Sequence, residues 1–343
     1  MKQIKAWLET TPYKEYSITV ASADASFRKY YRLSKGEKSF ILMDASLEKG
    51  SLTPFINVTH RLLHVDVNAP KILAQNLSLG YLILEDFGNT NMLDVLSNTN
   101  FKELYEKAIE TIIQMQKADT SDLPVYDKKF LHVEMDLMQE WYLQKELDLH
   151  LKKSQKELIS STLEAISKVV LSQPQNLFVH RDFHSRNIML TSKNELGIID
   201  YQDAMSGALT YDLVSLLKDC YIAFERKDIE ELALLFARKK GLHVENELFL
   251  KWFDFMGLQR HIKVLGIFSR LHLRDGKEGY LKDIPLTLRY IIETASRYNE
   301  TKEFAKLLSQ LSPGCRKKFS FFLSHALAFE NLSSVRNKKG YKL

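Results

Sequence analysis

The spacing of hydrophobic and polar residues changes near residue 90. Before that point apolar residues come in short runs that alternate with polar residues, and polar or glycine-containing turns separate the runs. A period of two in runs of this length is typical of half-buried strands. We expect strands over residues 16–22, 27–33, 39–45, 71–76 and 81–86, with a short helix over 54–64 between the third and the fourth. The pattern predicts a small antiparallel α+β lobe.

From residue 91 the period becomes helical. Phe101, Tyr105, Ala108, Ile112 and Met115 recur at steps of three and four residues, as on the apolar face of a helix. Two short strands, 187–191 and 196–200, are joined by the turn SKNE and predict a hairpin within this part. Further helices are expected at about 134–150, 154–172, 210–225, 228–240, 246–274, 286–298 and 301–311.

The two patterns predict two lobes that meet at Gly88. We expect an N-lobe over residues 1–88 and a C-lobe over residues 89–343. A chain of 343 residues is long enough for two lobes around a cleft. The expected fold class is α+β, with a small five-stranded antiparallel N-lobe and a larger, mainly helical C-lobe.

Composition and charge exclude several classes of protein. The net charge of +5 is spread along the chain without a block of like charges, so it predicts neither nucleic acid nor an anionic membrane as a partner. The only two cysteines, Cys220 and Cys315, argue against a disulfide framework or a cysteine zinc site. There is no signal-peptide core and no run of about eighteen apolar residues, so we expect a cytoplasmic protein. The basic stretch RNKKGYKL (336–343) is expected to be a solvated tail.

The stretch VHRDFHSRNIML (179–190) carries the clearest candidate chemistry. Asp182 lies on a loop, Asn187 begins one strand of the hairpin, and Asp200 ends the return strand. Because a hairpin brings its two ends together, we expect Asn187 and Asp200 to face a common point with Asp182 nearby. Carboxylate and amide oxygens suit Mg²⁺, and a second carboxylate can accept the proton of a hydroxyl nucleophile. This arrangement is typical of phosphoryl transfer.

Two other interpretations of this loop are not supported by its residues. His180 and His184 are four residues apart, but Arg181 stands where a zinc metalloprotease needs glutamate. Arg181 and Arg186 could contact phosphate, yet no basic stripe with aromatic residues surrounds them. The sequence alone indicates no role for His184, Ser185 or Arg186.

The same residues fit the kinase pattern H-R-D-x-x-x-x-N, which begins at His180 and ends at Asn187. IIDYQD (198–203) stands where protein kinases have D-F-G, and Asp203 adds a second carboxylate. This form resembles the small-molecule kinases of the aminoglycoside-phosphotransferase-like group more than the protein kinases. We therefore expect a protein-kinase-like bilobal fold whose N-lobe covers the nucleotide and whose C-lobe carries the catalytic and substrate-binding residues.

A candidate phosphate cover lies between the first two strands. SADAS (22–26) has no glycine, but its small residues allow backbone N–H groups to approach phosphate oxygens. The nucleotide-binding candidates here are Ser22, Ser26, Phe27 and Arg28. A plain hairpin turn is the alternative.

The third strand lacks the lysine that kinases place on the phosphates. Met43 and Asp44 occupy the expected positions, and the helix that follows has no interior glutamate. Phosphate charge would then be met by Arg28, Lys29 or Arg32, and we favour Arg28 because it is nearest the loop. Solvated charges at the edge of the strand are the alternative.

LILEDFG (82–88) is an apolar strand that ends at the lobe joint. Backbone groups of Glu85, Asp86 and Phe87 are candidates for contacts with an adenine edge.

A family resemblance covers residues 15–300. ADASFRKYYRL, ILMDA, LILEDFG, HRDFHSRN, IIDYQDAMSGALTYDLVSLLKDCY and GLQRHIKVLG together resemble the bacterial N-acetylmuramate/N-acetylglucosamine anomeric kinases. The resemblance implies ATP-dependent phosphorylation of the sugar C1 hydroxyl, and a uridylyltransferase that uses the α-1-phosphate. It implies Asp182 as the base, Asn187 and Asp200 on Mg²⁺, and His180 as a brace. Asp212 would support the loop or cap its own helix.

The sugar site is less constrained by the sequence. Arg260, Lys263, Arg270 and Arg274 lie on the polar side of the helix around 258–274 and would suit the lactyl carboxylate of N-acetylmuramate if the helix lines the cleft. A solvated basic face is the alternative. Asp203 would hold a sugar hydroxyl or assist the metal.

Competing functions stay open at this point. The chain is expected to act as a monomer on a small amino sugar. Kinases for choline, an aminoglycoside or another sugar are the nearest alternative. A nucleotide-binding pseudokinase is a further alternative, favoured by the missing lysine and disfavoured by the complete set of Asp182, Asn187 and Asp200.

Overall fold

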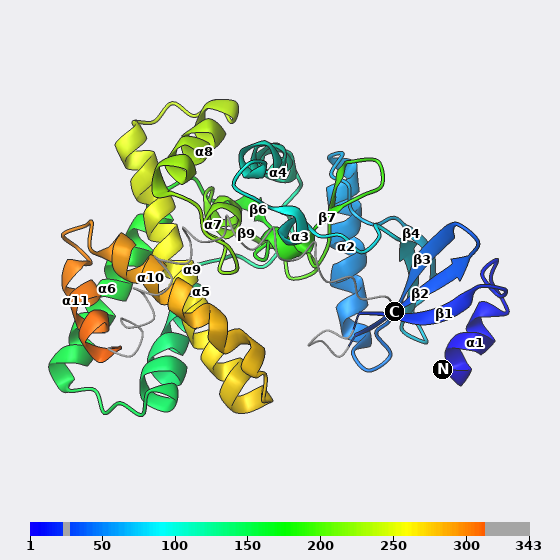
Figure 1. The fold of residues 1–343 in the computed structure, drawn as a ribbon, viewed down its shortest axis with the longest axis horizontal. Helices are drawn as coiled ribbons and strands as arrows, with labels where there is room; N and C mark the ends of the chain where they lie inside the picture. The colour runs from blue at the N-terminus through cyan, green and yellow to red at the C-terminus, as the bar shows by residue number, and fades with distance from the viewer. Residues whose placement is uncertain (23–27, 313–343) are drawn as a thin grey trace, which may run out of the picture. The chain divides into compact units, whose positions relative to one another are not determined.

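The structure, a computed structural model, describes residues 1–22 and 28–312 (Figure 1). These residues form two compact units, one built from Met1–Tyr126 and Pro174–Leu250 and the other from Asp127–Gln173 and the chain from Lys251 onward. The predicted division into lobes at Gly88 stays a prediction. The basic stretch 336–343 and Cys315 lie outside the described residues, and Cys220 is buried and forms no disulfide with a described residue.

The predicted five-stranded sheet is confirmed in the first unit. Its strand order is β1-β2-β3-β5-β4, and each neighbouring pair is antiparallel. Helix α2, Leu52–His64, follows β3 and precedes β4, as the sequence pattern predicts. The strands are β1 (Ser17–Ser22), β2 (Lys29–Lys35), β3 (Lys38–Asp44), β4 (Ile72–Asn76) and β5 (Tyr81–Glu85).

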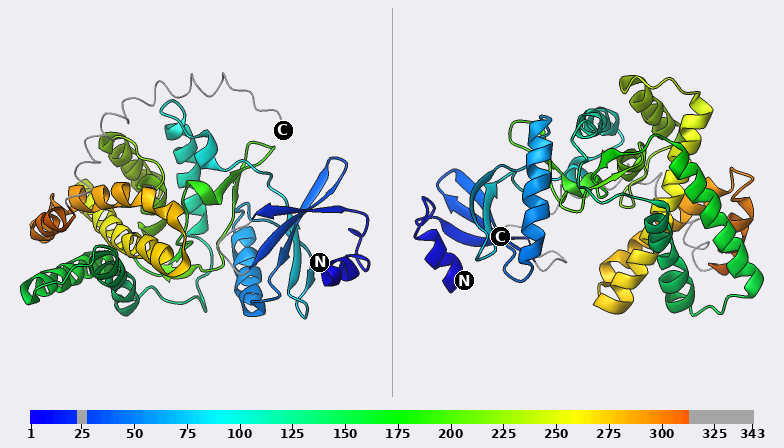
Figure 2. Two further views of the ribbon diagram at one scale, coloured as in Figure 1. Left: turned by 60° about the horizontal axis from the view of Figure 1, so that its bottom comes forward. Right: turned by 180° about the vertical axis from the view of Figure 1, so that it is seen from behind.

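A short N-terminal helix that the sequence pattern did not predict covers one face of this sheet. Helix α1, Lys2–Leu8, lies beside the strands in both views of Figure 2. Its Ile4, Trp7 and Leu8 share a buried cluster with Leu33 of β2 and Leu42 of β3. Seven residues are too few for a helical period to stand out in the sequence.

The rest of the first unit places the predicted hairpin among helices. The hairpin is confirmed as β7 and β8, which pair in antiparallel register. A second pair, β6 with β9, was missed because strands of three residues carry no readable alternation. The elements are α3 (Met92–Val95), α4 (Phe101–Met115), β6 (Leu177–Val179), β7 (Ile188–Leu190), β8 (Leu196–Ile198), β9 (Met205–Gly207), α7 (Tyr211–Leu217) and α8 (Arg226–Lys239).

Helix α7 ends eight residues earlier than the predicted helix over 210–225. Every residue of α7 is buried, so the apolar run of this segment showed no helical face that would mark its end. The chain turns at Asp219, whose carboxylate accepts the backbone N–H of Tyr221 at 3.1 Å.

The second unit is helical. The predicted helix over 134–150 instead begins at Lys128, where the Asp127 side chain caps it, and changes to a π-helical segment over Met138–Glu146. Gly266 of α9 lies so close to this junction that a Cβ atom would be 2.3 Å from the carbonyl carbon of Leu137. The helices are α5 (Lys128–Leu137), α6 (Lys153–Ser172), α9 (Asn246–Asp275, whose first turn belongs to the first unit), α10 (Ile284–Ala295) and α11 (Lys302–Leu311).

Short 3₁₀ turns complete the structure at Lys49–Ser51, Ser185–Asn187 and Glu278–Asp283. Within residues 1–22 and 28–312, no helix is both long enough and apolar enough to cross a bilayer.

Candidate active site

The catalytic loop follows β6 and is anchored by Asp212. The Asp212 carboxylate accepts the backbone N–H of His180 at 2.8 Å and of Arg181 at 3.1 Å. Burial raises the pKa of Asp212 to about 6, against the lowering effect of His180 and these N–H groups. The loop-supporting role expected as one alternative for Asp212 is therefore confirmed.

His180 braces the loop in one defined tautomer. The backbone N–H of Asp182 donates to Nδ1 of His180 at 3.3 Å, so Nδ1 carries no proton. Nε2 then carries the proton and donates to the carbonyl of Ile199 at 3.0 Å. The buried imidazole thus joins the loop to the residue before Asp200, in line with the bracing role that the resemblance implies.

Two residues of this region hold left-handed backbone conformations. Arg181 has φ +77° and Asp200 has φ +65°, which non-glycine residues rarely adopt. The Asp212 and His180 hydrogen bonds hold the backbone of Arg181 in place. Such conformations persist where surrounding contacts fix them, and they are frequent at functional sites.

The structure brings Asn187 together with both aspartates. Asn187 Nδ2 donates to the backbone carbonyl of Asp182 at 3.0 Å and to Asp200 Oδ2 at 3.3 Å. The first bond closes the loop on itself, and the second joins the two ends of the hairpin. The juxtaposition inferred from spacing is thereby present in the structure.

The donor atoms at this point fit a magnesium ion. Both hydrogen bonds that the Asn187 side chain makes within the described part of the chain use Nδ2, which leaves the oxygen Oδ1 for a cation. Asp200 adds a carboxylate. One carboxylate and one amide oxygen are few ligands, but Mg²⁺ normally completes its six positions with water and nucleotide phosphates.

Residues after Asp200 link its carboxylate to that of Asp203. Gln202 Nε2 donates to Asp200 Oδ1 at 3.0 Å and to Asp203 Oδ2 at 3.2 Å, so it links the two carboxylates. The Arg181 guanidinium donates to the backbone carbonyl of Asp203 at 3.4 Å. Asp203 is exposed.

Tyr201 connects the site to α2. Its buried ring stacks on Phe55 with centroids 5.2 Å apart and planes at 25°. Thr59 donates its hydroxyl proton to the Phe55 carbonyl at 2.7 Å, so Tyr201 must be the donor in the 2.8 Å hydrogen bond between the Tyr201 and Thr59 hydroxyls. Burial raises the pKa of Tyr201, which keeps this donor protonated.

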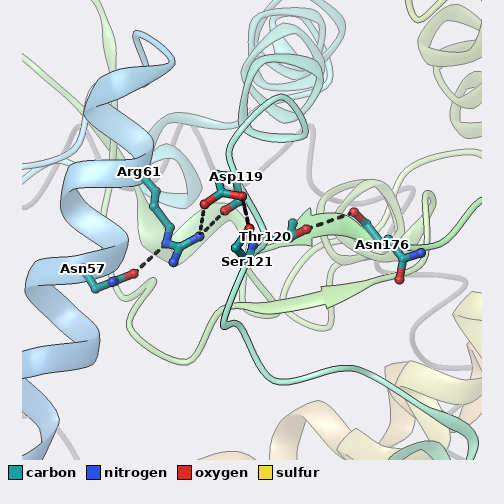
Figure 3. Close-up of polar contacts among 6 residues, drawn as sticks. All are labelled: Asn57, Arg61, Asp119, Thr120, Ser121 and Asn176. Atoms are coloured by element: carbon teal, nitrogen blue, oxygen red, sulfur yellow. Dashed lines mark hydrogen bonds and ion pairs between the residues drawn. The ribbon is translucent and has the colours of Figure 1, made fainter.

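Contacts through Asp119 and Thr120, which follow α4, also connect helix α2 to the residue before β6 (Figure 3). Arg61 donates to the carboxylate of Asp119 at 3.0 Å and to its backbone carbonyl at 2.6 Å. The next residue, Thr120, donates to the carbonyl of Asn176 at 3.3 Å. Since β6 begins at Leu177, this chain of contacts supports the strand that leads into the catalytic loop.

Ser185 and Arg186, which had no role from sequence, are both held by the segment after α7. The buried Asp219 carboxylate accepts the backbone N–H of Ser185 at 2.9 Å and its hydroxyl proton. The guanidinium of Arg186 lies 3.6 Å from the ring centre of Tyr221. A charged pair inside the apolar run LVSLLKDCY was the signal for Asp219, because buried charges require partners.

The nucleotide candidates are described only in part. Ser26 and Phe27 lie outside the described residues, as does the side chain of Ser22. Arg28, expected on the second strand, instead directly precedes β2, which begins at Lys29. Arg28 is half-buried, and its phosphate contact stays a prediction.

The Arg32 guanidinium is hydrogen-bonded to the segment after β5, which argues against its binding a nucleotide phosphate. Its guanidinium donates to both carboxylate oxygens of Asp86, at 2.6 and 3.0 Å, to Asn89 Oδ1 at 2.5 Å and to the Gly88 carbonyl at 3.0 Å. Burial alone would raise the pKa of Asp86, but hydrogen bonds from Arg32 and the Gly88 N–H hold it below its ordinary value. Phe87 packs against Gly197 of β8, so this segment is fixed on two sides.

The third strand has no lysine on its buried side. Met43 is 0% exposed and pairs with Tyr30 of β2 and Leu82 of β5. Asp44 accepts the backbone N–H of Ser46 at 3.0 Å. The absence of the usual lysine, inferred from the sequence, is thus a feature of the folded strand.

Arg260 and Lys263 are not on a solvated face. They are 4% and 6% exposed, and Lys263 forms a 3.0 Å ion pair with the equally buried Glu134 inside the second unit. The alternative of a solvated basic helix face is wrong for these two residues, whereas Arg270 is half-buried and Arg274 is exposed. Their contact with a sugar stays a prediction.

Comparisons with known proteins show the family of this chain. A model described as "Phosphotransferase enzyme family" matches residues 17–247, and this chain belongs to that family. It is a phosphotransferase. A Neisseria meningitidis protein named N-acetylmuramate/N-acetylglucosamine kinase is 38% identical over 321 residues, which cover 90% of this chain and 95% of the relative. A Pseudomonas aeruginosa protein of the same name is 37% identical over 316 residues, covering 90% and 92%.

Solved structures confirm the fold class. The ADP-bound aminoglycoside phosphotransferase APH(2'')-Ib superimposes with a TM-score of 0.59 at 15% identity, over 85% of this chain and 98% of that one. Choline kinase LicA from Streptococcus pneumoniae gives a TM-score of 0.59 at 11% identity over the same shares. The predicted protein-kinase-like fold, with a five-stranded antiparallel sheet and a mainly helical remainder, is therefore confirmed.

Proposed function

We propose that this phosphotransferase transfers the γ-phosphoryl group of ATP to the anomeric C1 hydroxyl of N-acetylmuramate, N-acetylglucosamine or both. The names of the relatives that match nine tenths of the chain support the substrate class. The observation that carries the reaction type is the closed loop in which Asn187 holds the Asp182 backbone and contacts Asp200.

Each residue of the loop then has one task. The Asp182 carboxylate accepts the proton of the C1 hydroxyl as that oxygen forms its bond to phosphorus and the bond from phosphorus to the leaving ADP oxygen breaks. Asn187 Oδ1 and Asp200 would hold Mg²⁺, which neutralises phosphate charge when bound. His180 and Asp212 hold the loop in its left-handed conformation at Arg181.

The remaining assignments belong to this proposal. Backbone groups of Glu85, Asp86 and Phe87 would contact adenine, and Arg28 would meet phosphate charge. Contacts with the sugar are proposed for Asp203, Arg260 and Lys263. We further propose a cytoplasmic monomer whose 1-phosphate product a uridylyltransferase consumes.

The test is turnover of a substrate panel by the wild-type protein and by Asp182→Asn. We expect ADP release with N-acetylmuramate or N-acetylglucosamine, and none with choline or an aminoglycoside. Asp182→Asn should retain ATP affinity and lose about 100-fold or more in kcat, because both the base and its orientation are changed. Asp136→Asn, an exposed position on α5, serves as the control. Turnover of choline or an aminoglycoside alone would overturn the substrate class, and near wild-type activity of Asp182→Asn would overturn the base.

A further inference from the structure

Arg186 of the catalytic loop has no acidic partner among the residues that the structure describes. It is half-buried and stacks on the ring of Tyr221, 3.6 Å from the ring centre. Within residues 1–22 and 28–312 its side chain makes neither a hydrogen bond nor an ion pair, in contrast to Arg32 on Asp86 and Lys263 on Glu134. A half-buried guanidinium whose N–H groups are unused can bind an anion from outside the chain.

The contacts around Arg186 hold it in place without using its donors. Asp219 accepts the backbone N–H of Ser185 at 2.9 Å through one oxygen and that of Tyr221 at 3.1 Å through the other. The loop and the aromatic ring are therefore fixed by the same carboxylate. The ring of His184 meets Tyr221 edge-on, at 5.3 Å and 83°. A guanidinium on an aromatic face keeps its N–H groups at its rim, where they match the two oxygens of a carboxylate.

Arg186 lies on the same loop as the proposed base, Asp182. It directly precedes Asn187, whose side chain closes the loop onto the Asp182 carbonyl at 3.0 Å. A sugar whose C1 hydroxyl meets Asp182 must therefore lie against this loop. The lactyl carboxylate of N-acetylmuramate is attached at C3, two ring atoms from C1, so a cation on the same loop is well placed to meet it.

The guanidinium of Arg186 is held away from the proposed metal ligands, which favours contact with the sugar carboxylate over contact with phosphate. Tyr221 belongs to the segment after α7, whereas the proposed metal ligands Asn187 and Asp200 lie at the two ends of the β7–β8 hairpin. The Arg186 guanidinium therefore lies against the segment after α7 and not against the hairpin.

We infer that Arg186 determines specificity for a carboxylate-bearing sugar, with Tyr221 and Asp219 as the residues that position it. The inference rests on the proposed function, since it concerns the acceptor of that same reaction. Arg260 and Lys263 were the earlier candidates for this carboxylate, and both are buried, with Lys263 already paired to Glu134.

The experiment compares kcat/KM for N-acetylmuramate and N-acetylglucosamine in the wild-type protein, Arg186→Gln and Arg186→Lys. We expect Arg186→Gln to lower the N-acetylmuramate to N-acetylglucosamine ratio by about 10- to 100-fold, the range of a charge-assisted hydrogen bond, mainly through KM. Arg186→Lys keeps the charge but loses the planar fork, so its ratio should be intermediate. Arg238→Gln, an exposed position on α8, should retain the wild-type ratio.

The outcomes separate this inference from the proposed function. An unchanged ratio in a folded Arg186→Gln protein overturns the role of Arg186 and leaves the proposed reaction intact. An equal loss with both sugars shows that Arg186 acts on the transferred phosphoryl group, and also overturns the inference. Wild-type protein that phosphorylates neither sugar overturns the proposed function and this inference with it.

Discussion

Asp212 anchors the catalytic loop, and replacing it by asparagine removes its charge while keeping its size and shape. The carboxylate is 1% exposed and accepts the backbone N–H groups of His180 and Arg181 at 2.8 and 3.1 Å. Asparagine keeps one oxygen acceptor and replaces the other by an NH₂ group, which cannot accept a hydrogen bond. One of the two loop N–H groups therefore loses its partner in Asp212→Asn.

Two effects of opposite sign determine the stability of this variant. The lost hydrogen bond to a charged group destabilises the fold by about 1.5–3 kcal/mol. Burial raises the pKa of Asp212 from 3.8 to about 6, so the folded protein binds this proton more tightly than the unfolded chain does. In the wild-type protein, the contribution of this proton to the free energy of unfolding is fully present below about pH 4 and is lost as the pH rises through about 6. Between about pH 5 and about pH 8 the loss is on the order of 1 kcal/mol, and the neutral asparagine does not share it.

Urea unfolding at about pH 5 and about pH 8 measures this difference. We expect Asp212→Asn to be less destabilised at the higher pH, by on the order of 1 kcal/mol. Turnover should fall by about 10- to 100-fold at both pH values, because the loop that carries Asp182 has lost one anchor. Asp136→Asn should change neither quantity. Equal destabilisation at both pH values would refute the buried-charge reasoning, and unaltered turnover would refute the anchoring role.

Two further substitutions test the packing around the fold and the site. Gly266→Ala would place a Cβ 2.3 Å from the carbonyl carbon of Leu137, so we expect a loss of about 1–3 kcal/mol in unfolding free energy; Gly279→Ala, where a Cβ meets nothing within 4 Å, is the control. Equal melting temperatures of the two variants would contradict the close approach. Tyr201→Phe removes the 2.8 Å hydrogen bond to Thr59 and should cost about 1 kcal/mol in chemical unfolding, while a change below a few tenths would show that water replaces the contact.

The catalytic loop could be predicted because its residues are joined by short, regular structure. One loop and one hairpin connect Asp182, Asn187 and Asp200, so their spacing along the chain limits their spacing in the fold. Partners from distant segments had no such constraint. The sequence left Asp212 between two roles, and only the bonds to His180 and Arg181 distinguish them.

Burial of charged residues was the harder property to predict. Periodicity assigns a charged stripe on a helix to solvent, as in the alternative considered for Arg260 and Lys263. Here Lys263 is covered because Glu134, far away in the sequence, supplies a buried partner on α5. Arg32 gave a similar result, since its partner Asp86 lies on the segment after β5 and no local pattern joins the two. Whether such a charged residue is buried depends on an oppositely charged residue from a distant part of the chain, and the local sequence pattern does not show it.

The third strand lacks the lysine that kinases usually pair with a glutamate of the following helix. In this chain α2 is instead joined to the residue after Asp200 by neutral contacts. Met43 is buried in its place, and α2 contacts Tyr201 through the Phe55 ring and the Thr59 hydroxyl. An ion pair at this depth would require two charges to leave water, whereas a neutral hydrogen bond and a stacked ring do not. Since Tyr201 directly follows Asp200, this contact fixes the backbone on the C-terminal side of the proposed metal ligand. Packing of Phe55 and Thr59 against Tyr201 thus positions the backbone at this point.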